Sequence, residues 1–394
     1  MVFRNETQLL KTNGIDVITF EKYNDNITKN ANGITSALNT IWSKDTYNEL
    51  KAIIQKEKPD IAHFHNIWYL LSPSAFYACK EEGIPVVQTL HNFRLFCANG
   101  LLLRRGQVCE ECVGKLPWKA IVYGCYRNSR FYSMPVALTE GIHRIKGTWE
   151  NKVDAYIALT EFGRNKFIEH GLPPDKITVK PNFILNSHQS HSLLEGKPAF
   201  TNENYIVFLG RLSNEKGVIT LINAFKILKD TVNKNTMLKI VGDGPLKTQI
   251  EDMMKTDGIS DVELTGRKTH SECMEILGKA RFMVIPSIWY ETFPLTALES
   301  FSCGKAVIAS RLGALAEIVQ DQKTGLLFEP GNPEDLALKM KWMIENEDAC
   351  IEMGRNARKE FESKYTAEKN FEMLMGIYDR VVRRWEDGKV GGWM

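Results

Sequence analysis

The chain has 394 residues, of which 50 are Lys or Arg and 48 are Asp or Glu, so its formal net charge at pH 7 is +2. This length suits two or three domains with their own cores, and the balanced charge excludes a strong overall field for nucleic acid. The sequence shows no apolar run of membrane-spanning length and no secretory leader. We therefore expect a cytoplasmic protein, which can still touch the inner face of the cytoplasmic membrane.

Residues 1–14 predict a helix that ends at Gly14, and residues 16–20 predict a strand directly after it. A doubly wound domain normally begins with a strand that feeds such a helix. We therefore expect that the chain lacks the first strand of its N-terminal domain, which would leave one position of the sheet unpaired. The alternative is that another segment of the chain fills that position.

Short apolar runs alternate with helical stretches through the rest of the first half, the pattern of βα units around a parallel sheet. Strands are expected at 61–65, 86–90, 155–160 and 177–180. His91 follows the second of these at the carboxyl end of a strand, where ligands bind in such sheets. A lone histidine is more often structural, and His63 and His65 lie at a comparable strand end.

Four of the eight cysteines fall within one stretch of the first half: Cys97, Cys109, Cys112 and Cys125. A Cys-x2-Cys pair can hold one tetrahedral ion, and the two flanking cysteines can complete a four-sulfur zinc site. Disulfides are disfavoured in a cytosolic chain. The alternative to a structural zinc is a set of unligated thiols, since free cysteines are commonly buried.

Basic and aromatic residues are interleaved between residues 113 and 149, where six Lys or Arg residues stand against one Glu. This pattern suits contact with anionic lipid or with a lipid-diphosphate acceptor. The alternative is a cap that packs on the first domain and keeps its basic face in water. The pattern also suits single-stranded nucleic acid, but nothing else in the chain supports such a partner, so none is expected.

The polar residues 183–204 predict a linker. Beyond it, strands are expected at 205–209, 237–241, 262–265, 282–286, 306–310 and 326–328, and helical periodicity covers 366–385. The expected fold is α/β with two Rossmann-like domains. They span 1–182, with the cysteine-containing insertion at about 94–150, and 205–365, followed by a C-terminal helical segment at 366–394.

Two motifs of the second half point to a ligand site. Residues 210–217 read GRLSNEKG and place Arg211 and Lys216 between a strand and a helix, where anions bind. Glu291 and Glu299 lie eight positions apart around Pro294, which suits the first turn of a helix. Glu291 then falls in the loop before the helix and Glu299 on its second turn. A cationic pair for phosphates and a carboxylate pair for hydroxyls together describe a site for a sugar nucleotide.

The half of the chain from about residue 205 to the end resembles the retaining family 4 glycosyltransferases of the GT-B fold. Their signatures are a Gly-Arg…Lys-Gly loop and a Glu-x7-Glu pair, and both occur here in order. The sequence VGDGP at 241–245 lies between them and GKAVIAS at 304–310 follows. The resemblance implies two Rossmann-like domains that face each other across a cleft, with the segment 366–394 crossing back to the first domain.

The resemblance also implies roles for single residues. Arg211 and Lys216 would stabilise the charge on the departing diphosphate, while Glu291 would hold sugar hydroxyls and Glu299 the ribose hydroxyls. His91 would lie near the transferred sugar. The remaining donor-binding positions would be Gly242, Phe293, Leu295 and Thr296, the last three through their backbone N–H groups.

The activity implied is transfer of a sugar, with retention, from a UDP- or GDP-linked donor to a saccharide or lipid-linked saccharide. Such reactions build capsule, exopolysaccharide or O antigen at the bacterial cell envelope, and the family needs no catalytic metal. Because a Gly-rich loop follows the first strand in this family, a nucleotide-binding but catalytically poor fragment is one alternative. A GT-B nucleotide-sugar 2-epimerase is a weaker one, since the two motifs argue against it.

Overall fold

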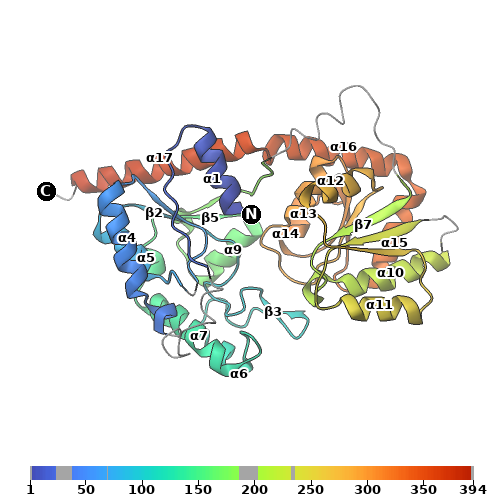
Figure 1. Cartoon of the computed structure of the whole chain (residues 1–394), viewed down its shortest axis with the longest axis horizontal. Coiled ribbons are helices and arrows are strands. Elements are labelled where there is room, and N and C mark those ends of the chain that lie inside the picture. Colours follow the sequence, from blue (N-terminus) through green and yellow to red (C-terminus); the bar gives the residue numbers. More distant parts are fainter. Residues whose placement is uncertain (1, 24–37, 69, 186–202, 232–235, 392–394) are drawn as a thin grey trace. The chain divides into compact units, whose positions relative to one another are not determined.

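The computed structural model describes residues 2–23, 38–68, 70–185, 203–231 and 236–391, with side chains as far as residue 387. The chain divides into two compact units. The N-terminal unit comprises Met1–Arg104, Cys109–Pro181 and Asn370–Met394, and the C-terminal unit comprises Arg105–Val108 and Asn182–Lys369. Most of the expected linker, residues 186–202, lies outside the described residues. Figure 1 shows the elements of both units.

The N-terminal unit is built on a four-stranded parallel sheet with the order β1-β2-β5-β6. Its strands are β1 (Ala62–Phe64), β2 (Val86–Thr89), β5 (Ala155–Ala158) and β6 (Ile177–Val179), which confirms four expected strands with slightly shorter bounds. Its helices outside the insertion are α1 (Val2–Thr12), α4 (Lys44–Glu57), α5 (Ser74–Glu81), α9 (Glu161–His170) and α17 (Ala367–Gly391).

Helices α1 and α17, from opposite ends of the chain, pack on the same sheet (Figure 1). Leu10 of α1 and Leu374 and Ile377 of α17 form one apolar cluster with Val87 and Ile157 of the central strands. The predicted helix at the start of the chain is confirmed, and Gly14, at φ +80°, follows its end as expected. The helix predicted at 366–385 is confirmed and is longer.

The prediction of a strand at residues 16–20 is wrong. These residues are described, but they form neither a strand nor a bridge. A strand needs a hydrogen-bonded neighbour, and the described part of the chain gives this segment none, because β1 pairs only with β2. Val17 instead packs against the α1–α17 cluster, while Ile18 is 44% exposed. The expectation that a first strand is lacking stays a prediction.

The insertion between β2 and β5 carries a short hairpin and three helices. These are β3 (Leu103–Arg104), β4 (Gln107–Val108), α6 (Trp118–Tyr123), α7 (Arg130–Ile145) and α8 (Thr148–Asn151). Helix α7 begins at a Ser129 cap, whose hydroxyl accepts from the Tyr132 N–H. Within the part of the chain that is described, no helix has both the length and the apolar character needed to cross a bilayer.

The C-terminal unit holds a six-stranded parallel sheet with the order β12-β11-β10-β7-β8-β9. The strands are β7 (Tyr205–Leu209), β8 (Met237–Val241), β9 (Val262–Gly266), β10 (Met283–Ile285), β11 (Val307–Ser310) and β12 (Gly325–Phe328). All six were expected. The helices are α10 (Val218–Thr231), α11 (Lys247–Thr256), α12 (His270–Lys279), α13 (Leu295–Ser302), α14 (Gly313–Ile318), α15 (Pro333–Glu345) and α16 (Glu347–Lys364).

Candidate active site

The order of the C-terminal sheet places β7 beside β10, although two strands separate them along the chain. The chain therefore winds outward from β7 in one direction and from β10 in the other. Ligands of doubly wound sheets bind at this point, beyond the carboxyl ends of the two strands. The loop 210–217 follows β7 and the loop 286–294 follows β10, so both sequence motifs lie at this position.

Two glycines allow the loops to approach one another. Gly217 has φ +67°, and a Cβ on it would lie 1.8 Å from the carbonyl oxygen of Pro286. A Cβ on Gly242, at φ +147°, would lie equally close to the carbonyl oxygen of Gly210. The Gly242 N–H already donates to Gly266 at 2.9 Å. Gly242 therefore contributes close backbone approach to this site and no spare N–H.

Gly217→Ala is expected to disrupt the loop far more than a glycine replacement elsewhere. Gly258 is the matched control, because it has φ +61° and no atom within 4 Å of its would-be Cβ. Gly258→Ala should cost about 1–2 kcal/mol of stability, the penalty of a left-handed residue. Gly217→Ala should add roughly 1–3 kcal/mol for the overlap and weaken nucleotide binding. Thermal unfolding with and without UDP checks this, and equal effects of the two variants would contradict the packing argument.

Lys216 and Glu291 contact each other directly. The Lys216 Nζ lies 2.8 Å from Glu291 Oε1, which also accepts the Ser287 hydroxyl at 2.5 Å. Glu291 is 6% exposed, and Lys216 lies 5.5 Å from the centre of the Trp289 ring. Arg211 lies on the same loop and is exposed. The structure thus brings one predicted phosphate ligand and one predicted hydroxyl ligand together as a partly buried ion pair.

Glu299 lies on the second turn of α13, with its side chain 14% exposed and its carboxylate 3.6 Å from His270 Nδ1. Burial raises the pKa of Glu299 to about 7. Helix α13 begins at Leu295 after a Pro294 cap, one residue later than a proline in the first turn would place it. The N–H groups of Leu295 and Thr296, the first two residues of the helix, have no carbonyl partner within it, whereas the Ala297 N–H donates to the Pro294 carbonyl at 3.0 Å. The first two N–H groups can therefore donate to an anion.

Trp289 is a candidate site residue that the sequence did not single out. Its indole N–H is buried and has no hydrogen-bond partner among the described residues. It follows Ser287 in the loop after β10 and lies beside Lys216. An unpartnered buried donor next to a cation is available to a ligand oxygen.

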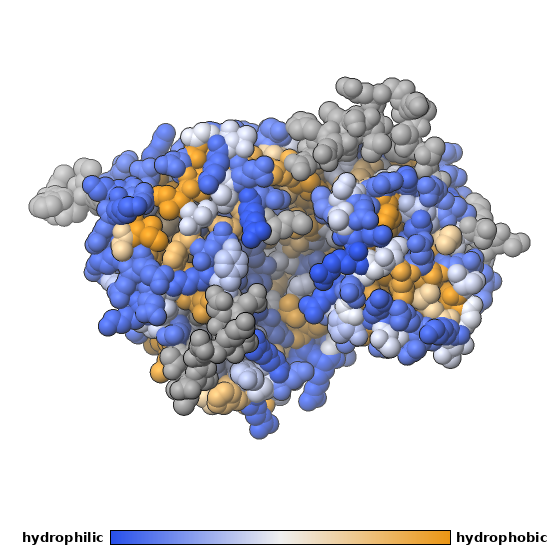
Figure 2. All heavy atoms as spheres, viewed as in Figure 1, coloured by the Kyte–Doolittle hydropathy of each residue, from blue (hydrophilic) through white to orange (hydrophobic). Residues whose placement is uncertain are grey.

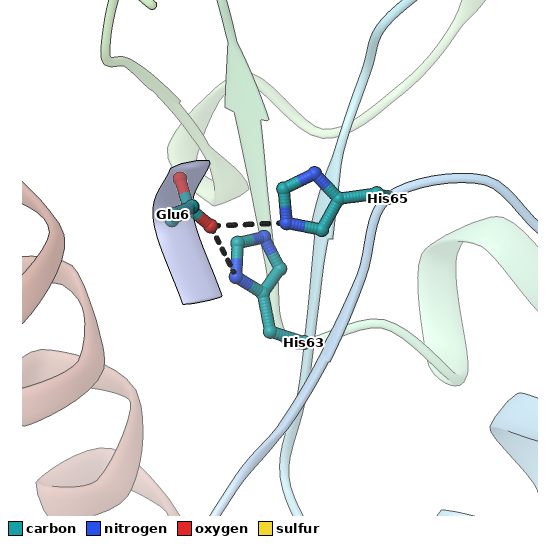
Figure 3. A group of neighbouring side chains, drawn as sticks. All are labelled: Glu6, His63 and His65. Atoms are coloured by element: carbon teal, nitrogen blue, oxygen red, sulfur yellow. Dashed lines mark hydrogen bonds and ion pairs between the residues drawn. The ribbon is translucent and has the colours of Figure 1, made fainter. Parts of the chain in front are cut away.

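A second polar cluster lies at the carboxyl edge of the sheet in the N-terminal unit, and Figure 3 shows three of its side chains, Glu6, His63 and His65. Glu6 of α1 accepts from His65 Nε2 at 3.0 Å, lies 3.2 Å from His63 Nδ1 and pairs with Lys180 Nζ at 3.0 Å. The His63 ring also contacts the Tyr378 hydroxyl at 2.7 Å. His65 follows β1 and Lys180 follows β6, so parallel strands bring these side chains to one edge.

His91 joins this cluster through His65. Its Nε2 lies 2.8 Å from His65 Nδ1, and the two rings stack with centres 5.0 Å apart. Burial raises the pKa of Glu6, but the charge on Lys180 and the contacts with His63 and His65 outweigh it and hold that pKa well below its ordinary value. Ionised Glu6 must accept the proton of His65 Nε2. In neutral His65, Nδ1 then accepts from His91 Nε2–H, which fixes the tautomer of His91.

The ligand atoms of Glu6, His63 and His65 all lie within 4.8 Å of one another, a spacing that can hold a metal ion. The buried ammonium of Lys180, only 2% exposed, argues against a cation at this place because it already neutralises the same carboxylate. We therefore interpret the cluster as a hydrogen-bonded network that orients His91. Burial lowers the pKa of His63 to about 4 and that of His91 to about 3, so both rings are neutral at pH 7.

Comparison with known proteins identifies the chain. Residues 192–360 match the family of glycosyl transferases group 1, and residues 21–185 match glycosyltransferase family 4. An uncharacterized glycosyltransferase of Methanocaldococcus jannaschii is 28% identical over 345 residues, which cover 86% of this chain and 89% of that protein. The chain belongs to the family 4 glycosyltransferases.

Solved structures show the fold of this glycosyltransferase. A glycosyltransferase from Rickettsia africae superposes with a TM-score of 0.65 at 18% identity, covering 95% of this chain and 87% of that one. Anabaena HepE, in complex with UDP and glucose, gives a TM-score of 0.60 at 17% identity, with 94% and 88% covered. Both similarities, together with the two parallel sheets, confirm the predicted GT-B fold.

Sequence reasoning missed two residues of the N-terminal cluster in this glycosyltransferase, Glu6 and Lys180. Glu6 appeared as one polar position on an amphipathic helix, and Lys180 as the last residue of a predicted strand. A usable signal was present, because Lys180, His65 and His91 all stand within two residues after a parallel strand. Polar residues at that place in neighbouring strands meet at one edge of the sheet. Glu6 gave no comparable signal.

Proposed function

We propose that this glycosyltransferase moves a sugar from a nucleoside-diphosphate donor to a saccharide or lipid-linked saccharide, with retention of configuration at the anomeric carbon. The observation that carries the proposal is the Lys216–Glu291 pair at the crossover of the C-terminal sheet. Anabaena HepE is solved with UDP, which supports a uridine donor here. Surface-polysaccharide synthesis is the process that we propose for it.

In the proposed reaction an acceptor oxygen attacks the anomeric carbon as the bond from that carbon to the phosphate oxygen breaks. Arg211 and Lys216 stabilise the charge that develops on the departing diphosphate, and the first-turn N–H groups of α13 assist. Glu291 holds sugar hydroxyls. The acceptor proton passes to the leaving phosphate oxygen, so no carboxylate nucleophile is needed. By resemblance to the family, we assign neutral His91, oriented by His65, as a hydrogen-bonding group for the transferred sugar.

The test is release of nucleoside diphosphate from UDP-sugars with and without a saccharide acceptor, with the anomeric configuration of the product read by NMR. Acceptor-dependent release with an unchanged configuration supports the proposal. A product of inverted configuration would overturn the retaining assignment. Conversion of the donor sugar to its 2-epimer without an acceptor would favour an epimerase. Nucleotide binding without any release would favour the catalytically poor fragment.

The raised pKa of Glu299 predicts that nucleotide affinity depends on pH. The ionised carboxylate accepts hydrogen bonds from ribose hydroxyls better than the protonated acid does. UDP affinity should therefore increase several-fold as pH rises through about 7. The measurement is calorimetry between about pH 6 and pH 8, which brackets that pKa.

Two controls separate Glu299 from titration of the UDP phosphates. The first is 2′,3′-dideoxy-UDP, which has the same phosphates and lacks the hydroxyls, and it should lose most of the pH dependence. The second is Glu299→Gln, which should bind UDP more weakly by roughly 1–3 kcal/mol and show the phosphate dependence alone. A Glu299→Gln profile identical to that of the wild-type protein would remove Glu299 from the ribose site.

A surface of the N-terminal unit supports peripheral membrane contact. Large apolar side chains are exposed along α6 and α7 and at Leu116 just before α6. These elements lie within residues 113–149, whose one acidic residue, Glu140, is buried. The most exposed are Ile145 at 77%, Phe131 at 63% and Trp118 at 59%. The others are Leu116, Val122, Tyr123, Tyr132, Met134 and Leu138. Figure 2 shows one face of the molecule, on which hydrophilic residues predominate and hydrophobic residues form patches on both units. We propose that this α6–α7 surface rests on an anionic bilayer.

Phe131→Glu is expected to weaken binding to phosphatidylglycerol vesicles roughly tenfold or more, because it replaces an inserted aromatic ring by a charge that anionic lipid repels. Leu338→Glu is the matched control, since Leu338 is 65% exposed on α15 of the other unit. That variant should bind vesicles like the wild-type protein. Co-sedimentation with vesicles measures both. Equal binding by Phe131→Glu and the wild-type protein would contradict this surface.

A further inference from the structure

The cysteines of the insertion lie in turns whose backbone is fixed by hydrogen bonds. Cys109 directly follows the β3–β4 hairpin, and its N–H donates to the Leu102 carbonyl at 2.8 Å. The Lys115 N–H donates to the Cys112 carbonyl at 3.2 Å, closing the next turn. A hairpin followed by a tight Cys-x2-Cys turn is a common arrangement of structural zinc sites.

The two flanking cysteines are held in the same way. The Cys97 N–H donates to the Phe93 carbonyl at 2.9 Å. Cys125 follows Gly124, which ends α6 in the left-handed conformation, and the Cys125 N–H donates to Ala120 at 3.0 Å. All four cysteines are unpaired thiols of the N-terminal unit.

Ion pairs hold together the segments that carry the thiols. Glu111, the neighbour of Cys112, pairs with Arg104 of the hairpin at 2.9 Å and with Lys119 of α6, the helix before Cys125, at 2.9 Å. Among the described residues, the ligand atoms that lie within 4.8 Å of one another are those of Glu6, His63 and His65. The sulfurs of the four cysteines do not form such a group. Binding would therefore draw the four sulfurs inward by side-chain rotation.

Glu140 provides a second and independent observation. It is 2% exposed, and both of its carboxylate oxygens are buried with no hydrogen-bond partner among the described residues. Burial raises the pKa of this carboxyl well above its ordinary value, although the charge on Arg94 acts to lower it. A buried carboxyl without a partner is costly, and a missing ion is one of its few explanations. A thiolate sulfur of a metal site beside it can accept a hydrogen bond from this carboxyl.

We propose that Cys97, Cys109, Cys112 and Cys125 bind one zinc ion, with Glu140 as an acidic neighbour of the site. Four thiolates satisfy the tetrahedral preference of zinc, and a closed set of four protein ligands makes the site structural. The ion would tie the hairpin, the Cys-x2-Cys turn and the end of α6 together, so its binding energy becomes local folding energy. All four ligands belong to the N-terminal unit, and the proposal assigns them no step of sugar transfer.

The test is the metal content of the full chain, purified under reducing conditions without a chelator or a polyhistidine tag. Elemental analysis should find about one zinc per chain. Titration of the intact wild-type protein with a mercurial, which caps thiols, should release that zinc into a chromogenic chelator. Folded wild-type protein that contains no zinc and takes up none from solution would overturn the proposal.

Three variants assign the metal to its ligands. Cys112→Ser should lose zinc, whereas Cys273→Ser, on α12 of the other unit, should keep it. His65→Asn should also keep it, and loss of zinc in this variant would instead place the metal in the Glu6 cluster and overturn the assignment. Cobalt added to zinc-free wild-type protein should give thiolate-to-metal absorption, which does not depend on any variant folding. These measurements need no transferase activity, so they test the zinc site independently of the proposed function.

Discussion

Lys216→Ala is expected to lower turnover by about ten- to a thousandfold, the usual loss when one group that stabilises transition-state charge is removed. The effect should fall mainly on turnover, because negative charge on the diphosphate grows as the bond to the sugar breaks. Replacement also leaves buried Glu291 without its cation. Arg211→Ala should lower turnover within the same range.

Steady-state rates with a UDP-sugar and a saccharide acceptor measure these losses. Lys226→Ala is the matched control, since Lys226 forms a surface pair with Asp257 at 3.1 Å in the same unit. It should retain wild-type turnover. Full activity of Lys216→Ala would remove this residue from the donor site and leave Arg211 alone in that role.

Glu6→Gln is expected to destabilise the N-terminal unit by about 3–5 kcal/mol, the cost of leaving a buried charge unpaired. Lys180 would be that charge, with its side chain only 2% exposed. A double variant, Glu6→Gln with Lys180→Met, removes both partners and should recover much of the loss. Glu49→Gln, which breaks an exposed pair with Lys22, is the control and should cost less than about 1 kcal/mol.

The pH dependence of the Glu6 effect has a definite sign. The folded pKa of Glu6 is lowered, so its contribution is present above the ordinary pKa of a glutamate and is lost as pH falls through the folded value. His63 is neutral when folded down to about pH 4, so stability should also decline as pH falls from about 6.5 toward that value. Urea unfolding at several pH values measures both. An equal penalty for Glu6→Gln above and below the folded pKa would contradict the ionised pair.

The sequence predicted ten of the strands because each is an apolar run bounded by turn residues, and burial on both faces of a parallel sheet demands that pattern. Residues 16–20 have the same composition and form no strand, because strand formation also requires a neighbour that composition does not reveal. The positions of Lys216 and Glu291 could be predicted because their motifs lie in segments that follow parallel strands, and that of Glu299 because Pro294 marks the start of the next helix. The 2.8 Å contact between Lys216 and Glu291 could not, because 75 residues separate them and only the order of β7 and β10 joins their loops.

The Glu6 cluster shows a different limit. His63, His65 and His91 are visible as polar residues near strand ends, but their partner comes from a helix 59 residues before His65. Nothing in the local pattern of α1 distinguishes Glu6 from a solvated position. The buried Lys180 makes the same point, because a lysine at a strand end is usually exposed. Pairs of buried charges from distant segments depend on tertiary packing, and a single sequence does not contain that information in a local form.

The ion pair between Lys216 and Glu291 bears on the release of product. In the proposed mechanism a nucleoside diphosphate draws Lys216 toward its phosphates, which leaves Glu291, 6% exposed, with the Ser287 hydroxyl but without its cation. An intact sugar nucleotide avoids that cost, because its sugar hydroxyls replace the lysine on Glu291. The spent nucleotide has no such hydroxyls, so under the proposed roles we expect Lys216 to return to Glu291 once the sugar has moved. We therefore propose that the same contact favours departure of the product over its retention.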